Sequence, residues 1–229
     1  MDKAVDRIEV AEGKDTAIYI AAGSAKAFVA LVQWGVIEIR PWRSRRPRLD
    51  RPDRLIFDLD PDDAVAWSDL VSGVGLLHTL LQELGLHSFL KTTGGKGLHV
   101  VVPIRPTLDW EQAKGFSRAL AEFLVRTFGR RFTPTVSKAR RKGMIFVDYL
   151  RNAEGATANA PYAVRAGSGA PVSMPIEWEE LADEVRFDHF NVRSLKEQIA
   201  SRKRDPWSEF AATKQTITKA HGKKMGLAI

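Results

Sequence analysis

Two carboxylates stand in a stretch that otherwise reads as a buried strand, LIFDLDP at residues 55–61. Successive side chains of a strand point to opposite sides, so Asp58 and Asp60 share one face while the apolar residues between them share the other. Two charges about 6 to 7 Å apart repel by about 2.5 kcal/mol at an effective dielectric near 20. A divalent cation with hard oxygen ligands would offset that repulsion. The alternative is a strand end at which both carboxylates reach water.

A third carboxylate occurs in a second strand-like stretch, MIFVDYL at residues 144–150. Alternation places Asp148 on one face with Phe146, and two aliphatic residues on the other. Two carboxylates on one strand and one on another are what a two-metal phosphoryl-transfer site needs. Alternatively, Asp148 is a structural residue that pairs with Arg141 or Arg151.

A glycine-rich stretch, TTGGKGLH at residues 92–99, separates two further strand-like segments. Its glycines allow backbone amides to approach an anion, Lys96 adds positive charge, and His99 enters the next strand. The spacing is not that of a P-loop, because a strand rather than a helix follows. The alternative is a hairpin with a lone surface lysine.

Basic residues are concentrated in two segments of a chain whose net charge is +7. Seven arginines and two aspartates lie between Arg40 and Arg54, interleaved with prolines, and a second cluster, SKARRKG, spans 137–143. Such clusters suit polyanions, because each phosphate contact releases counterions. A solvated, solubilising surface is the alternative. The candidate DNA contacts in the first segment are Trp42, Arg43, Arg45, Arg46 and Arg48.

Composition excludes several classes of protein. The chain has no cysteine, so disulfides and thiolate metal sites are absent, as suits a reducing cytoplasm. No stretch approaches the roughly 20 apolar residues of a membrane span, and the N-terminus lacks a signal peptide's apolar core. We therefore expect a bacterial-type cytoplasmic protein with no membrane partner, in which oxygen or imidazole holds any metal.

The hydrophobic pattern indicates a mixed arrangement of strands and helices. Strands are expected at 16–20, 36–40, 55–60, 87–93, 98–104, 144–150 and 162–166. Helices are expected at 24–35, with a stripe of Phe28, Leu31 and Val32, at 67–84 and at 108–128 with Asp109 as N-cap, and from about Pro175 onward. A basic tail covers about 214–229. No strict βαβ rhythm appears, so we predict an α/β (α+β) fold with a mixed or antiparallel sheet and packed helices.

The order of these motifs resembles a known family. A DxD strand, a Gly-Lys-Gly-x-His hairpin and a basic run before a third strand carboxylate are similar to the three motifs of archaeo-eukaryotic primases. FDLDP, GGKGLHVVVP, FVDYLRN, APYAVRA and PVSMPIEWEEL closely resemble the polymerase domain of bacterial ATP-dependent DNA ligase D, from about Thr16 to Phe210. The resemblance implies one primase-type domain over 1–229, and we expect it to lack an N-terminal segment with which the family grips the template.

Roles for individual residues follow from the resemblance. It implies that the catalytic, metal-binding residues are Asp58, Asp60 and Asp148, with Mn²⁺ or Mg²⁺ as the ions. It implies that the triphosphate of a nucleoside triphosphate is held by Thr93, Lys96, His99, Arg141 and Arg165. The family usually has Ser at the position of Thr93, which keeps the hydroxyl, and commonly has His at the position of Arg40.

The activity that the resemblance implies is a nucleotidyltransferase of the 2.7.7 class. It would add nucleotides, preferably ribonucleotides, to a 3′ end of gapped or broken DNA in non-homologous end joining, with Ku and ligase or phosphoesterase modules as partners. One alternative is a catalytically weak or inactive DNA-end-binding module. Another is a DxD-type phosphohydrolase with Asp58 as nucleophile and Asp60 as acid, which leaves the glycine-rich hairpin without a role.

Overall fold

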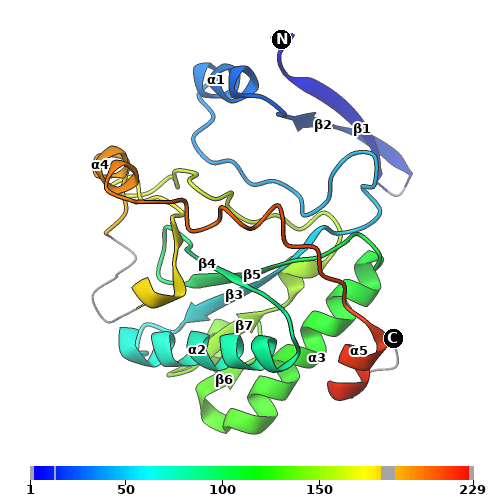
Figure 1. The fold of residues 1–229 in the computed structure, drawn as a ribbon, viewed down its shortest axis with the longest axis vertical. Coiled ribbons are helices and arrows are strands. Elements are labelled where there is room, and N and C mark those ends of the chain that lie inside the picture. Colours follow the sequence, from blue (N-terminus) through cyan, green and yellow to red (C-terminus); the bar gives the residue numbers. More distant parts are fainter. Residues whose placement is uncertain (1–2, 13, 182–188, 227–229) are drawn as a thin grey trace. The chain divides into compact units, whose positions relative to one another are not determined.

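The carboxylate strand β3, Arg54–Pro61, lies inside a six-stranded sheet. The computed structural model describes residues 3–12, 14–181 and 189–226. The other strands of this sheet are β4 (Phe89–Thr92), β5 (Leu98–Pro103), β6 (Phe132–Thr133), β7 (Ile145–Asp148) and β8 (Pro175–Ile176). Their order is β6-β7-β3-β5-β4-β8; β6 and β7 are parallel, and the other neighbours are antiparallel (Figure 1). The predicted mixed sheet is confirmed.

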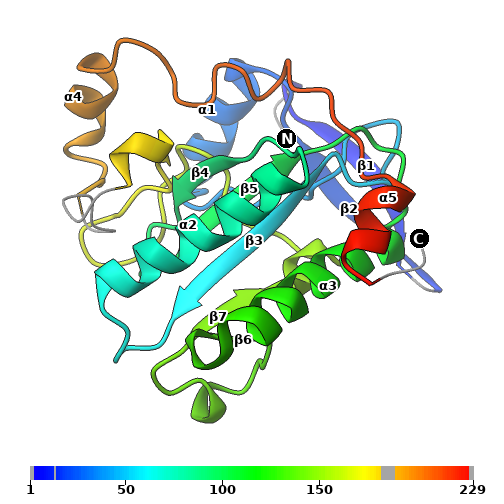
Figure 2. The ribbon, with the colours of Figure 1, turned by 60° about the horizontal axis from the view of Figure 1, so that its bottom comes forward.

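The two faces of β3 have the predicted separation of apolar and acidic side chains. Leu55, Phe57 and Leu59 are completely buried in the main hydrophobic core. That core is closed by helices α2 (Trp67–Glu83) and α3 (Trp110–Phe128), which lie across this face of the sheet (Figure 2). The opposite face therefore carries the carboxylates and stays free of helices α2 and α3.

The ends of the long helices agree with the capping signals in the sequence. Asp109 is the N-cap of α3, where its side chain accepts from the backbone N–H of Gln112 while the Gln112 side chain accepts from Asp109. Helix α2 ends before Gly85, which adopts φ of 71° and so takes a conformation that favours glycine. Both predicted helices are confirmed, with α3 starting two residues later than predicted.

Contacts divide the chain into two compact units, Met1–Ile39 and Arg40–Ile229. The first contains β1 (Asp6–Glu12), which was not predicted, paired antiparallel with β2 (Asp15–Ala21), and helix α1 (Ala25–Gln33). The single domain predicted over 1–229 stays a prediction.

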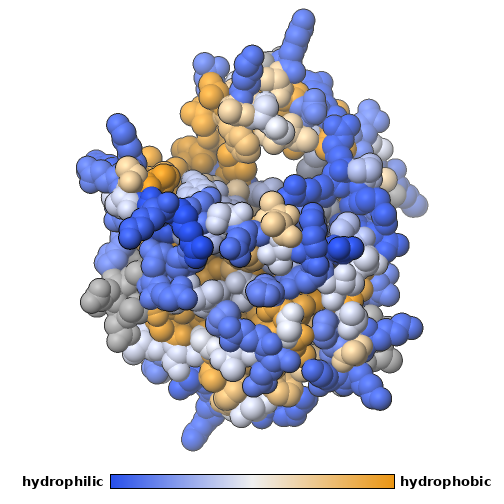
Figure 3. Space-filling view, in the orientation of Figure 1, coloured by the Kyte–Doolittle hydropathy of each residue, from blue (hydrophilic) through white to orange (hydrophobic). Residues whose placement is uncertain are grey.

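The predicted apolar stripe of α1 is wrong in two of its three members. Leu31 is buried with Ala27 and Ala30, whereas Phe28 and Val32 are exposed. Small alanines rather than large residues face the core of this unit, so the stripe is rotated relative to the prediction. Orange, hydrophobic residues are visible on this unit in Figure 3. The exposed large hydrophobic residues of the unit are Ile18, Ile20, Phe28, Val29, Val32, Trp34 and Ile37.

Two predicted strands are absent from the described residues. Segment 36–40 alternates like a strand but forms none, and its Ile37 is exposed. Segment 162–166 contributes only an isolated bridge between Val164 and Val172. Backbone hydrogen bonds join 162–165 to 171–173 without forming a regular ladder, and 36–40 pairs with none of the described strands.

The C-terminal part is less helical than predicted. After Pro175 the described residues form β8, two short α-helices, α4 (Leu195–Ala200) and α5 (Lys219–Lys224), and irregular chain. The predicted basic tail is packed rather than free, because Ile217 and Met225 are buried in the main core. The predicted helical region and the predicted basic tail also include residues 182–188 and 227–229, which lie outside the described residues. Among the described residues, no helix has the length and apolarity to cross a membrane.

Candidate active site

The three predicted carboxylates come together because β3 pairs with β7. Asp58 and Asp148 are directly opposite each other in the antiparallel register, and Asp60 lies two residues further along β3. Opposed residues of neighbouring strands project to the same face, so all three carboxylates share the face opposite the helices. The sheet therefore assembles the acidic set that the sequence predicted.

Two arginines lie against these carboxylates. Arg151 Nε is 3.1 Å from Asp148 Oδ2 and 3.4 Å from Asp58 Oδ2. Arg141 Nη1 is 3.2 Å from Asp60 Oδ2, and its guanidinium is also held by the Thr135 carbonyl. Arg151, one of the two partners considered for Asp148, thus contacts both Asp148 and Asp58. The carboxylate oxygens that a metal ion would use thus already contact positively charged side chains.

The surroundings shift the pKa values of the carboxylates in different directions. Burial raises the pKa of Asp58, but the ring of His99 and the guanidinium of Arg151 outweigh it and hold the pKa at about 2. Burial and the neighbouring Asp58 charge raise the pKa of Asp60. Burial likewise raises the pKa of Asp148, against the effect of Arg151. Burial thus disfavours the charges of Asp60 and Asp148, and a bound cation would offset that effect.

His99 lies beside Asp58 as its cross-strand partner on β5. Its Nε2 is 3.4 Å from Asp58 Oδ2, and its buried Nδ1 has no hydrogen-bond partner among the described residues. Burial, followed by the charge of Lys91, lowers the pKa of His99 to about 4. The ring is therefore neutral near pH 7, and it becomes a cation only in the acidic range in which Asp58 itself titrates.

The glycine-rich turn joins β4 to β5 and closes on itself. The Thr93 hydroxyl donates to the Gly97 carbonyl at 3.0 Å and accepts from the Gly95 N–H at 3.1 Å. Gly97 is required by close approach, because a Cβ there would meet the Leu59 carbonyl at 2.7 Å. Lys96 is exposed and pairs with Asp63. The turn therefore presents a lysine next to the carboxylate strand, as predicted.

A cavity of about 550 Å³ connects these groups. Its size lies within the range usual for small-molecule sites. Of the residues predicted to bind metal or nucleotide, the lining includes Asp58, Asp60, Thr93, Lys96, His99, Arg141 and Arg165. Asp148 is the one member of the predicted set that does not line it. Residues that the sequence did not assign also line it, namely Arg40, Lys138, Arg151 and Asn159.

Lys91 is a further charged residue that sequence reasoning missed. It is opposite His99 on β4, so Asp148, Asp58, His99 and Lys91 form a row across four strands. The Lys91 side chain is buried and donates to Ser173 Oγ at 2.5 Å. Burial lowers its pKa to about 7, against the attraction of Asp58. A lysine inside the otherwise uncharged FLKT strand was the available signal.

The predicted DNA contacts fall into two groups. Arg43 is buried, and its Nη1 and Nη2 donate to the Ala156 and Ala153 carbonyls at 2.9 Å. A guanidinium held inside the protein by two carbonyls cannot reach a phosphate, so the structure gives Arg43 a structural role in place of the predicted DNA contact. Trp42 is half-buried, and the remaining members are exposed: Arg45, Arg46 and Arg48.

Comparison with known proteins agrees with this geometry. Residues 1–207 match the family described as the LigD primase-polymerase domain. The chain belongs to that family. A relative in Pseudomonas aeruginosa, the multifunctional non-homologous end joining protein LigD, is 43% identical over 204 residues, which are 89% of this chain and 24% of the relative. The bifunctional LigD of Bacillus subtilis is 28% identical over 150 residues, 65% of this chain and 24% of that protein.

A solved structure has the same fold. It is the polymerase domain of Mycobacterium tuberculosis ligase D in complex with DNA, with a TM-score of 0.84 and 27% sequence identity. The match covers 92% of this chain and 76% of that chain. The chain spans about a quarter of the length of the curated relatives that it matches.

Proposed function

We propose that this LigD primase-polymerase domain is a nucleotidyltransferase that adds nucleotides to a DNA 3′ end during non-homologous end joining. The observation that carries the proposal is the pairing of Asp58 with Asp148, with Asp60 two residues along, beside a cavity lined by several basic side chains. The names of the relatives and the DNA bound to the M. tuberculosis domain support it.

The donor chemistry of the site fits Mg²⁺ or Mn²⁺. All three side chains supply hard carboxylate oxygens, and the Arg151 guanidinium already places positive charge against two of them. The described residues contain no ready-made cluster of three acidic or imidazole ligands, so ion binding would draw the carboxylates closer. When bound, two such ions would activate a 3′ hydroxyl and neutralise charge on the triphosphate.

The remaining side chains would bind and orient the nucleotide. Lys96 projects from the glycine-rich turn, while Arg141 is fixed by its stacking 3.7 Å from the centre of the Phe146 ring. Together with Arg165 they would neutralise the triphosphate, and guanidinium groups match phosphate oxygens in pairs. His99, neutral and buried, would hold Asp58 in position through Nε2–H and donate to a phosphate only if it turned from this contact.

The finer parts of the proposal come from the family resemblance. They are a preference for ribonucleotides, and Ku together with ligase and phosphoesterase modules as partners. The phosphohydrolase alternative requires a free Asp58 nucleophile, whereas Asp58 is only partly exposed and contacts both His99 and Arg151. Measurement of pyrophosphate release distinguishes a polymerase from the inactive DNA-binding module, because only the polymerase releases pyrophosphate.

Primer extension on a gapped duplex with Mn²⁺ and either ribo- or deoxyribonucleotides tests the proposal. The wild-type domain should release pyrophosphate, and Asp58→Ala should lower the rate at least tenfold, a loss of about 1.4 kcal/mol or more in transition-state stabilisation. DNA binding should persist in this variant, because a negative charge beside a polyanion is removed.

Asp69→Ala, on the exposed first turn of α2, is the matched control and should keep the wild-type rate. Extension by Asp58→Ala at more than about a tenth of the wild-type rate would show that the metal assignment is wrong. Absence of pyrophosphate release from the wild type, with DNA binding intact, would favour the inactive binding module.

A further inference from the structure

A second cavity, of about 370 Å³, is lined by six basic side chains together with prolines and other apolar residues. We call it the arginine groove and define it by Arg45, Arg46, Arg48, Arg51, Arg105 and Lys214. Asp53 is the acidic residue that also lines it. This excess of positive charge within a concave surface favours an extended anion rather than a neutral ligand.

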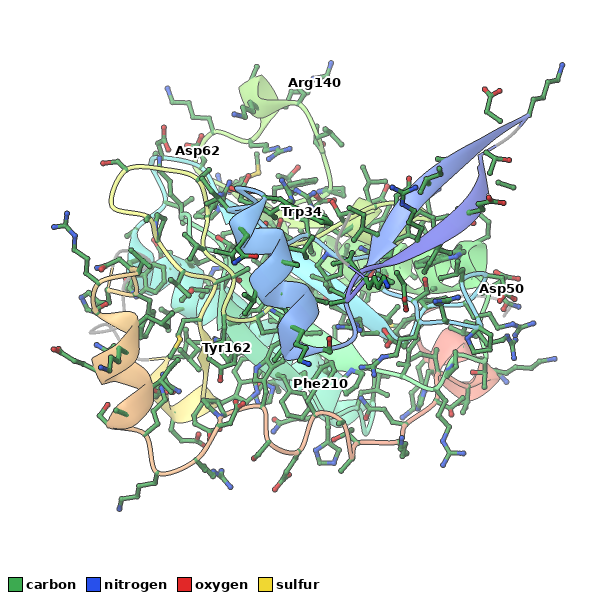
Figure 4. All side chains as sticks on the ribbon, turned by 90° about the horizontal axis from the view of Figure 1, so that it is seen from above. Trp34, Asp50, Asp62, Arg140, Tyr162 and Phe210 are labelled. Carbon is green, nitrogen blue, oxygen red and sulfur yellow. The ribbon has the colours of Figure 1, made fainter. Side chains whose placement is uncertain are left out.

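The arginine groove is at the opposite end of β3 from the carboxylates. The strand begins at Arg54, beside the groove residue Asp53, and reaches Asp60 six residues later. At about 3.3 Å per residue, the two ends are about 20 Å apart. Figure 4 shows the same separation: Asp62, just after β3, and Asp50, just before it, lie on opposite sides of the view.

The groove opens on the same face of the sheet as the carboxylates. Arg54 alternates in phase with Asp58 and Asp60, and its guanidinium lies 5.8 Å from the ring centre of the groove residue Phe210. Phe210 in turn packs against the buried cluster of Ile56, Val101, Ala158 and Trp207, in which Ile56 lies between Arg54 and Asp58 on this face. An extended ligand that passes over this cluster could reach both the carboxylate site and the groove.

The floor of the groove is fixed before any ligand binds. The Gln215 side chain donates to the carbonyls of His87 and Pro103, at 2.7 and 2.8 Å, and the Arg105 N–H donates to the Gln215 carbonyl. Phe210 stacks on Trp207 with ring centres 4.8 Å apart. The end of β5 and the chain after Phe210 are thus held together, which lowers the entropy cost of binding across them.

Only some of the basic residues of the groove form ion pairs within the protein. Arg45 pairs with Asp53, and Arg48 and Arg51 both contact Asp50. Arg105 and Lys214, on the other wall, make no ion pair among the described residues and are exposed. These two side chains are free to meet a phosphate.

We propose that the arginine groove binds the phosphodiester backbone of the DNA duplex behind the 3′ end, about six nucleotides from the carboxylates. The inference rests on the proposed function, which places a 3′ end at Asp58. Successive phosphates of one strand are about 3.4 Å apart along the duplex axis, so about 20 Å corresponds to about six of them. Guanidinium groups suit this backbone because they bind phosphate oxygens bidentately.

The double charge reversal Arg105→Glu with Lys214→Glu tests the groove. Binding is measured by fluorescence anisotropy without nucleotide, on gapped DNAs with 4 or 10 base pairs of duplex behind the 3′ end, over a series of salt concentrations. Wild type should bind the longer duplex more tightly. The variant should lose roughly 10- to 100-fold in affinity for the longer duplex, and its slope of log K against log salt should fall by about 2.

The control is Arg126→Glu with Arg130→Glu, which changes the net charge equally at the far end of α3. It should keep the preference for the longer duplex, and thermal melting should show that both variants are folded. Equal losses in the two double variants, or a wild-type preference that survives in the groove variant, would overturn the inference.

Failure of the groove is distinguishable from failure of the proposed function. If the wild type extends primers and the groove variant binds the longer duplex with wild-type affinity, only the groove proposal is wrong. A wild type that binds both DNAs with the predicted length preference but never releases pyrophosphate excludes the polymerase activity and keeps the groove as a duplex-binding surface.

Discussion

On one face of β3, Leu55, Phe57 and Leu59 are fully buried against helices α2 and α3. On the other face, Asp58 and Asp60 lie among arginines and a histidine beside the main cavity. The same eight-residue strand thus contributes hydrophobic burial on one side and a charged site on the other.

The two faces differ in how they affect the free energy of unfolding. Apolar burial stabilises the fold by about 25 cal/mol per Å² removed from water. The carboxylate face instead holds groups in surroundings that disfavour their charges, since the pKa values of Asp60 and Asp148 are raised and that of Lys91 is lowered. Such sites reduce stability and are retained for what they bind. Removal of the buried Phe57 ring should therefore lower stability, whereas removal of the buried Lys91 charge should raise it.

The largest effect is expected on the core face. Phe57→Ala should lower the free energy of unfolding by about 3 to 5 kcal/mol, because it removes a fully buried ring between sheet and helices. Urea denaturation monitored by circular dichroism measures the change. Phe128→Ala, at a partly exposed position, should cost about 1 kcal/mol or less. Similar losses in both variants would remove the distinction between the core face and the surface.

A smaller effect of opposite sign is expected at Lys91. Burial lowers the pKa of Lys91 to about 7 from its usual 10.5, so between these values the unfolded chain binds more protons than the folded chain. Wild-type stability from this group therefore rises with pH through that window. Lys91→Met should be more stable than wild type by about 1 to 3 kcal/mol near pH 6. This excess should shrink toward pH 10 in denaturation series; an excess that grows with pH would contradict the sign.

The smallest effect on stability is expected at Asp60. Its side chain is half-exposed, its pKa is raised by burial and by Asp58, and its contact with Arg141 opposes that rise. Asp60→Asn should therefore leave the free energy of unfolding within about 0.5 kcal/mol of wild type. Pyrophosphate release should nevertheless fall at least tenfold. A variant that unfolds much more easily would show that Asp60 is structural rather than a ligand.

Local patterns in the sequence predicted much of this arrangement. Alternation in β3 and β7 gave the correct faces for Asp58 and Asp148, and capping residues such as Asp109 located the helices. These signals work because they depend on neighbours within a few residues of each other. The glycine-rich stretch was also predicted correctly as the connection between two strands.

Features that depend on distant partners could not be predicted in this way. Arg43 lies in a basic loop, but its carbonyl acceptors are more than 100 residues away, so its burial has no local signal. Lys91 joins the site only because β4 pairs with β5 in one register. Segment 36–40 has the alternation of a strand and lacks a neighbouring strand to pair with. Topology rather than periodicity decides each of these cases.

The register of β3 bears on whether a folded but inactive form of the protein can exist. A slip of one residue against β5 and β7 would exchange Phe57 and Asp58 between the faces, placing an aspartate among the helices and a phenylalanine beside the main cavity. Misaligned molecules would therefore be poorly folded as well as inactive. A preparation should contain very few chains that are native by spectroscopy but catalytically dead, and titration of nucleotide-binding sites should equal the concentration of folded protein.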